Sequence, residues 1–270
     1  PVMRVAFAGD RDLAVQVLDH LLDRGERPVA LLVAGPPGAS HAEELRARCA
    51  HLDDGDVFAG PQGLRAGIDR LAALDLDYLL SVHYPHLVPA EALALPRIAA
   101  LNLHPAYLPY NRGWHTPTWA LLDGSPIGAT LHVMVEEVDA GAIVHRRRLE
   151  PSPGDTAHSL YGRLKALELD VFREAWPDLA EGRLVTSVPD EAGSWHRRAD
   201  LFDPAVQRID LDAPTTAGAV LRHLRALTTD RWDEAAWFEV DGRRFRVRVD
   251  VAPDPPDGGR PETPGGPPDR

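Results

Sequence analysis

The chain has 270 residues, of which 44% are hydrophobic and 26% are charged, a composition typical of globular proteins. Its 41 acidic and 29 basic residues give a formal net charge of −12, which disfavours nonspecific binding to nucleic acid or to an anionic membrane. The one cysteine, Cys49, excludes an intrachain disulfide, and neither an apolar run of 18 residues nor a secretory signal pattern is present. We therefore expect a cytoplasmic protein with no nucleic-acid partner and no membrane partner.

The N-terminal half alternates short apolar runs with segments of helical periodicity. Met3–Ala8 predicts a strand, and the apolar positions of Leu13–Arg24 recur at helical spacing, with Gly25 placed to end that helix. Further strands are expected over 28–33, 77–82 and 98–103, and further helices over 42–52 and 64–74. Strands separated by helices of this length predict an α/β fold with a mostly parallel sheet.

The second half begins with two β-rich runs, 128–135 and 142–149, which predict a hairpin-like element added to the sheet. A long helix over 155–184 is expected to close the first domain. The remaining chain predicts a small α+β extension, with a helix over 216–227 and a hairpin around Asp241-Gly242. Trp195, Trp232 and Trp237 can line an interface or form a small local core, and the core is the default because large aromatic side chains are usually buried.

These patterns divide the chain into three parts. We expect a first domain over 1–184, a C-terminal extension over 185–251 and a disordered tail over 252–270. The tail has seven prolines and four glycines among 19 residues and no large apolar side chain, so it cannot bury enough surface to order itself.

Nucleotide-binding and metal motifs are missing from this sequence. The first strand is followed by a single glycine, Gly9, and neither G-x-G-x-x-G nor G-x-x-x-x-G-K-[ST] occurs. NAD and P-loop nucleotides are therefore disfavoured. No H-E-x-x-H or comparable spacing is found, so a metal is disfavoured as well.

Polar side chains gather where the strand over 98–103 ends. Asn102 and His104 are two residues apart, so in an extended chain they lie on one face. Ligands of open α/β sheets bind beyond the carboxyl ends of the strands, so both side chains are expected in one crevice. Alone, the pair is weak evidence of catalysis.

The wider pattern is more specific. The order Asn102-x-His104-Pro105, Leu108-Pro109, Arg112-Gly113 and Asp139-x-Gly141 resembles the folate-dependent formyltransferase family, whose members act on glycinamide ribonucleotide, methionyl-tRNA or amino sugars. The resemblance runs from about residue 3 to 184 and is most specific over 98–144. It implies a Rossmann-like, doubly wound catalytic domain, N10-formyltetrahydrofolate as formyl donor, and a catalytic trio of Asn102, His104 and Asp139.

The chemistry of the reaction suits these three residue types. Formyl transfer to an amine passes through a tetrahedral species with a developing oxyanion, to which the amide of Asn102 can donate. His104 can accept a proton from the attacking amine. Asp139 is expected to orient the ring and to raise its pKa by opposite charge. Other roles stay open, since His104 can be satisfied by backbone groups and Asp139 can cap the turn before Gly141.

The resemblance also implies where the substrates bind. It places the pterin of the donor on two loops that carry Leu87, Val88, Val135, Glu136, Glu137 and Val138. It places the acceptor on the loop that carries Tyr110, Arg112, Gly113, Trp114 and His115, a stretch most similar to sugar-type members. Any of these residues can instead have a plain loop role, with the two glutamates and Arg112 at the surface.

The acceptor is expected to be a small-molecule amine, with a nucleotide-linked amino sugar as the first choice. Residues 196–250 carry 10 Arg and 10 acidic residues, whereas a transfer-RNA acceptor calls for a basic surface. An amino-acid or hydroxylamine acceptor stays open, and so does hydrolysis of formyltetrahydrofolate by a deformylase. A non-catalytic sensor is disfavoured by the intact trio, and a homodimer is possible.

Overall fold

The computed structural model describes residues 2–255. Most of the expected disordered tail, 256–270, therefore lies outside the described residues. Within 2–255, no helix combines the length and the apolar character needed to cross a membrane.

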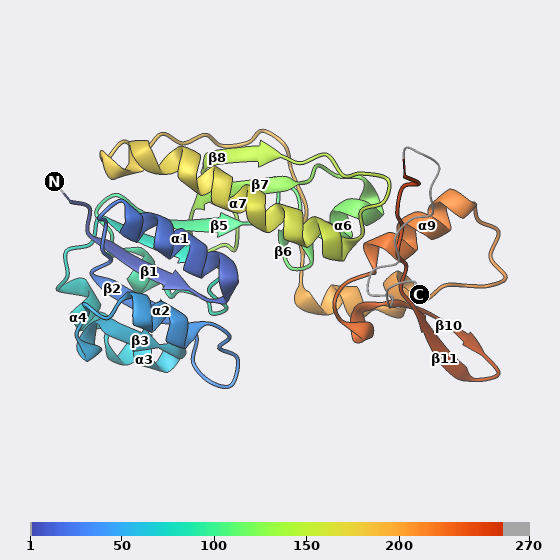
Figure 1. The fold of residues 1–270 in the computed structure, drawn as a ribbon, viewed down its shortest axis with the longest axis horizontal. Coiled ribbons are helices and arrows are strands. Elements are labelled where there is room, and N and C mark those ends of the chain that lie inside the picture. Colours follow the sequence, from blue (N-terminus) through green and yellow to red (C-terminus); the bar gives the residue numbers. More distant parts are fainter. Residues whose placement is uncertain (1, 256–270) are drawn as a thin grey trace, which may run out of the picture.

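A seven-stranded sheet forms the centre of the N-terminal part (Figure 1). Its strands, in spatial order, are β3 (Val57–Ala59), β2 (Ala30–Val33), β1 (Val5–Gly9), β4 (Tyr78–Val82), β5 (Ala99–His104), β7 (Gly128–Val133) and β8 (Ile143–Arg148). The first five run parallel, and β7 and β8 are antiparallel additions. The order reverses between β1 and β4, so the doubly wound α/β fold expected from the sequence is confirmed.

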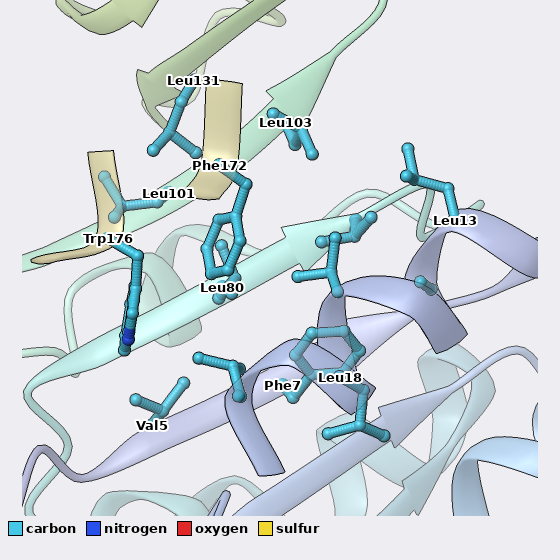
Figure 2. Packing of buried hydrophobic residues seen from close by; sticks show 14 of the residues in the cluster. Val5, Phe7, Leu13, Leu18, Leu80, Leu101, Leu103, Leu131, Phe172 and Trp176 are labelled. Carbon is cyan, nitrogen blue, oxygen red and sulfur yellow. The ribbon is translucent and has the colours of Figure 1, made fainter. Parts of the chain in front are cut away.

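The central strands are apolar because both faces of the sheet are covered. Every residue of β1, β2 and β4 is buried, as expected for strands between two helical layers. On one face, α1 (Arg11–Asp23) and α7 (Ala157–Ala180) pack on the sheet, and Figure 2 shows Phe7, Leu18 and Phe172 in this core.

Shorter helices complete the two layers. Their bounds are α2 (Ala42–Arg48), α3 (Gly60–Ala66), α4 (Ile68–Ala72), α5 (Ala90–Leu93) and α6 (Thr116–Asp123), with a 3-10 turn η1 at Asp54–Asp56. Leu64 of α3, Leu71 of α4 and Ala92 of α5 pack with Phe58 against the opposite face of the sheet.

Three local features differ from the sequence prediction. The expected helix over 64–74 is divided between α3 and α4 at Gly67, where a Cβ would lie 2.3 Å from Cε1 of Phe58. The strand β3 was not predicted, since three residues are too short to show a period. The expected helix over 42–52 is also shorter and ends at Arg48.

The C-terminal extension projects from one end of the sheet domain (Figure 1). Its elements are β9 (Trp195–His196), η2 (Arg198–Phe202), α8 (Pro204–Gln207), α9 (Ala217–Ala226), η3 (Trp232–Glu234), β10 (Ala236–Val240) and β11 (Arg243–Val247). The predicted hairpin is present as β10 and β11, with positive φ at both Asp241 and Gly242, as a two-residue hairpin turn requires.

The expected tryptophan core of the extension is wrong for two of the three residues. Trp237 is buried, but Trp195 is 50% exposed and Trp232 is 57% exposed. The core of the extension consists of Leu201, Leu227 and Ala236 instead. Aliphatic side chains fill this small core, and the two exposed indoles remain available for contacts outside it.

Candidate functional site

The trio predicted from the sequence comes together at the end of β5. Asn102 Nδ2 lies 3.5 Å from Asp139 Oδ1, and His104 Nε2 lies 3.5 Å from Asp139 Oδ2. Asn102 and His104 share a face of β5, and Asp139 is brought to them by the loop between β7 and β8. The three side chains therefore converge, as alternate positions of a strand and a returning loop allow.

The loop that carries Asp139 fits only because Gly141 has no side chain. A Cβ at Gly141 would lie 1.7 Å from the carbonyl oxygen of Val133, so any other residue would push the loop away from β7. Asp139 itself has a positive φ of 52°, a conformation that Asp tolerates better than most residues. The Asp139-x-Gly141 spacing is thus a backbone requirement of the site.

His132 belongs to the site and was left without a role by the sequence. On β7 it lies directly opposite Asn102 in register, with Nε2 at 3.3 Å from Asn102 Nδ2 and at 3.4 Å from Asp139 Oδ1. Its Nδ1 is 2.9 Å from the carbonyl oxygen of Val133. His132 Nε2 therefore lies between the Asn102 amide and the Asp139 carboxylate and links the two side chains.

Asp139 is an ionised group in a buried setting. Its carboxylate accepts a hydrogen bond from the backbone N–H of Gly113, 3.0 Å from Oδ2. Burial alone would raise the pKa of Asp139, but the neighbouring His104 and His132 rings and the Gly113 N–H outweigh it and hold the pKa far below its ordinary value. Asp139 therefore carries its negative charge at neutral pH.

The expected rise in the pKa of His104 is wrong. Burial lowers the pKa of His104 below its ordinary value of 6.5, and this effect exceeds the opposite effect of the Asp139 charge. The ring is therefore neutral at pH 7, and its Nε2 is buried with no hydrogen-bond partner among the described residues. A neutral imidazole is suited to accept a proton.

The predicted acceptor loop follows β5 and contacts the loop after β7 through Gly113 and Arg112. Gly113 holds Asp139, and Arg112 forms an ion pair of 2.7 Å with Glu137. Trp114 is half exposed, and the guanidinium of Arg198 lies 5.3 Å from the centre of its ring.

The other two acceptor-loop residues differ in their surroundings. His115 Nδ1 lies 3.9 Å from Glu234 Oε1 in the extension, and burial lowers the pKa of His115. Tyr110 is half buried. Arg112 and Gly113 thus contact residues of the site, whereas Trp114 and His115 contact the extension.

The residues expected to contact a pterin lie on two loops, one after β4 and one after β7. Leu87, on the loop after β4, is 80% exposed, and Val135 and Val138, on the loop after β7, are also exposed. Exposed apolar side chains of this kind suit a flat ring. Val88 packs instead against the core beneath. Glu136 and Glu137 are at the surface, and Glu137 joins this loop to Arg112.

The positions of two cavities bear on where the chemistry takes place. The smaller, about 190 Å³, is lined by Arg112 and Asp139 together with Val188 and Glu191 from the segment that leads to the extension. The larger, about 560 Å³, lies between α6 and α9 and contains none of the predicted site residues. We place the chemistry at the trio, because convergent polar groups and an altered pKa are found there.

Comparison with known proteins agrees with this geometry. Residues 3–176 match the formyl transferase family, and residues 202–253 match a domain described as the N-formyltransferase dimerization C-terminal domain. A dTDP-4-amino-4,6-dideoxyglucose formyltransferase of Mycobacterium tuberculosis is 29% identical over 225 residues, covering 80% of this chain and 94% of the relative. A methionyl-tRNA formyltransferase of Phenylobacterium zucineum is 30% identical over 253 residues, covering 92% of this chain and 80% of the relative.

Solved structures show the same fold. A 4-N formyltransferase from Francisella tularensis superposes with a TM-score of 0.78 at 22% identity, covering 94% of this chain and all of the other. A sugar N-formyltransferase from a Shewanella species gives 0.76 at 21% identity, covering 93% and 98%. The family match extends over more than half of the sequence and includes the trio, and we conclude that this chain belongs to the formyl transferase family.

Proposed function

We propose that this protein transfers a formyl group from N10-formyltetrahydrofolate to the amine of a nucleotide-linked amino sugar. The observation that carries the proposal is the convergence of Asn102, His104 and Asp139, with the buried Nε2 of His104 unpartnered among the described residues. The relative named dTDP-4-amino-4,6-dideoxyglucose formyltransferase supports it, and so does a sugar 3N-formyl transferase whose structure was solved in the presence of dTDP and 5-N-formyltetrahydrofolate.

Each residue of the trio has a definite task in this proposal. The folate donor supplies the formyl carbon that the amine attacks. Asn102 Nδ2 donates a hydrogen bond to the oxygen as negative charge develops on it. His104 Nε2 accepts the proton of the attacking amine and returns it to the departing nitrogen of the donor. Asp139 stabilises the imidazolium form while it exists.

The binding residues also fit the two substrates. Exposed Leu87, Val135 and Val138 offer an apolar surface for the pterin beside the trio. Arg112, Gly113 and Trp114 lie on the loop after β5, on which we place the acceptor, and Tyr110 and His115 flank them. Arg198 beside Trp114 adds a positive charge at this place in an otherwise acidic chain, which suits a phosphate group.

A small acceptor is favoured over methionyl-tRNA, even though methionyl-tRNA formyltransferases are among the relatives. The chain carries a net charge of −12, and its residues 196–250 are balanced at 10 Arg and 10 acidic residues. Binding of a transfer RNA depends on many phosphate contacts from basic side chains. The charge of this chain supports an acceptor with few phosphates.

An acceptor comparison tests the proposal. Purified protein is incubated with N10-formyltetrahydrofolate and either a dTDP-4-amino-4,6-dideoxy sugar, methionyl-tRNA, a free amino acid, hydroxylamine or no amine, and tetrahydrofolate release is followed. We expect release that depends on the dTDP-amino sugar and is lost in the His104→Ala variant. Equal release without any amine would assign a deformylase, and release with another acceptor alone would reject the sugar.

We also propose that the protein is a homodimer, with residues 1–184 as catalytic domain and 185–251 as an extension that contains the dimer contacts. The match of residues 202–253 to a dimerization domain supports this. Sedimentation velocity is expected to give twice the 29.5 kDa chain mass. A cytoplasmic location likewise stays a proposal, which cell fractionation tests.

A further inference from the structure

The first strand of the extension pairs with the acceptor loop. This strand, β9, runs parallel to β6 (Arg112–Gly113), which lies in the loop after β5. The N–H of Arg112 donates to the carbonyl oxygen of Ser194 at 2.9 Å, and the N–H of Trp114 donates to that of His196 at 3.0 Å. The loop is therefore held on both sides of its glycine by backbone groups that lie outside the predicted catalytic domain.

Gly113, between those two donors, connects β9 to the trio. Its own N–H does not bond to β9 but donates to Asp139 Oδ2 at 3.0 Å, as the alternation of N–H groups along a strand allows. Gly113 has a positive φ of 92°, and a Cβ there would lie 2.3 Å from the carbonyl oxygen of His196. The close approach of β9 therefore requires glycine, and one residue lies between the extension and the carboxylate.

The side chain of His196 anchors β9 on the catalytic domain. Its ring stacks on Trp119 of α6, with the ring centres 4.1 Å apart and the planes inclined by 5°. His196 Nε2 and Trp119 Nε1 are both buried, and neither has a hydrogen-bond partner among residues 2–255. Contact between the two flat rings, rather than a hydrogen bond at these nitrogens, therefore holds β9 against α6.

We propose that His196 is a positioning residue that acts through β9 and Gly113 on Asp139. The stack on Trp119 fixes β9, and β9 fixes the loop that carries Gly113. The N–H of Gly113 then holds the Asp139 carboxylate, whose Oδ2 lies 3.5 Å from His104 Nε2. The extension thus contributes to the geometry of the trio as well as to any dimer contact. Only the effect on turnover rests on the proposed function, since the contact between Gly113 and Asp139 can be measured without substrate.

The first test measures that contact by NMR on protein labelled with 15N-glycine. The Gly113 amide signal is assigned by its loss in Gly113→Ala, and a short bond to a carboxylate should move its proton downfield. We expect the downfield position in the wild type and in His196→Phe, which keeps a flat ring. We expect an upfield shift in His196→Ala, in the same direction as in Asp139→Ala. His51→Ala is the matched control, because this ring contacts the carbonyl oxygen of Pro28 (2.9 Å), before the start of β2 and at the opposite edge of the sheet.

The second test is a double-mutant cycle on turnover, measured in single-turnover experiments. His196→Ala is expected to lower the rate of formyl transfer by about tenfold to a hundredfold, because it lets the carboxylate of Asp139 move. His196→Phe should keep the rate, and His51→Ala should leave it unchanged. In an Asp139→Ala background the carboxylate is already absent, so adding His196→Ala should lower the residual rate by less than about twofold. An independent structural effect would lower the rate by the same factor in both backgrounds.

The outcomes distinguish this proposal from the function itself. An unchanged Gly113 signal in a folded His196→Ala variant, or equal losses of rate in both backgrounds, would overturn the positioning role. The expected NMR shift with no formyl transfer by the wild type would reject the proposed function and leave the link from His196 to Asp139 standing. The NMR shift with a full rate would overturn the effect on turnover. If His196→Ala fails to fold by circular dichroism, His196→Leu, which fills the space without a flat ring, takes its place with the same expectations.

Discussion

At the scale of single residues, the protonation state of His104 depends more on its burial than on its pairing with Asp139. The sequence predicts that Asp139 lies beside His104, and we therefore expected the carboxylate to raise the pKa of the ring. Both side chains are buried in the structure. Burial destabilises the imidazolium form of His104 more than the Asp139 carboxylate stabilises it, so the pKa of His104 is lowered. The result is a neutral histidine next to an ionised aspartate, the protonation states that proton transfer from an amine requires.

This protonation state predicts the pH dependence of turnover. A base must be unprotonated, so activity is present above the pKa of His104 and is lost as pH falls through it. Because burial lowers that pKa from 6.5, the acid limb of kcat/KM is expected below pH 6.5. Asp139→Asn removes a charge that favours the imidazolium, so its residual activity should show the limb at still lower pH. A wild-type limb above pH 7 would contradict the assignment.

Asn102 tests the amide donor separately. Its Nδ2 lies 3.3 Å from His132 Nε2 and 3.5 Å from Asp139 Oδ1, and these contacts set the direction of the amide. Asn102→Ala is expected to lower kcat by about 10²–10³, the usual effect of removing one oxyanion donor, with an unchanged far-UV circular dichroism spectrum. Asn102→Asp preserves the shape and should lose as much, since it places a second carboxylate beside Asp139. Near-normal turnover in Asn102→Asp would show that turnover does not require a hydrogen bond from the Asn102 amide.

At the scale of elements, the sequence predicts the strands and helices that have a regular apolar pattern. It does not predict contacts that depend on how strands pair in the sheet or on residues distant in the chain. Six strands of the sheet, β1, β2, β4, β5, β7 and β8, were predicted from their apolar runs, and the helices α1 and α7 from apolar positions at helical spacing. His132 could not be given a role, because only the pairing of β5 with β7 places it opposite Asn102. Gly67 could not be identified as a break either, because its neighbour Phe58 lies nine positions earlier in the chain.

Helix α7 carries two carboxylate–histidine pairs that make a matched comparison. Glu168 is fully buried, with His83 Nε2 at 2.9 Å, whereas Glu174 is exposed, with His145 Nε2 at 2.7 Å. Removing one partner of a buried pair leaves an uncompensated polar group, and Glu168→Ala is expected to cost about 3–5 kcal/mol in the free energy of unfolding. Glu174→Ala should cost about 0–1 kcal/mol. Denaturant unfolding of both variants decides, and equal costs would refute the distinction.

At the scale of the whole molecule, the trio and the exposed Trp232 of the extension lie at different places. The trio comes from one chain, at the carboxyl edge of its sheet, whereas the hairpin of β10 and β11 projects at the far end (Figure 1). The sequence predicted that hairpin from its turn, but for Trp232 it left a core and an interface open and favoured the core, whereas the side chain is 57% exposed. Composition alone does not show whether an indole faces its own domain or a second chain.

Trp232 therefore offers the sharpest test of the proposed dimer. It is 57% exposed, beside Arg248, within the residues that match the dimerization domain, and aromatic side chains are enriched in interfaces. Trp232→Glu places a charge on this surface, and sedimentation velocity is expected to show a shift from dimer to monomer. Val185→Glu, at a site 79% exposed and outside that match, is the control and should remain dimeric. Because the trio needs no residue from a second chain, the Trp232→Glu monomer should keep its turnover per chain, and a persistent dimer would place the interface elsewhere.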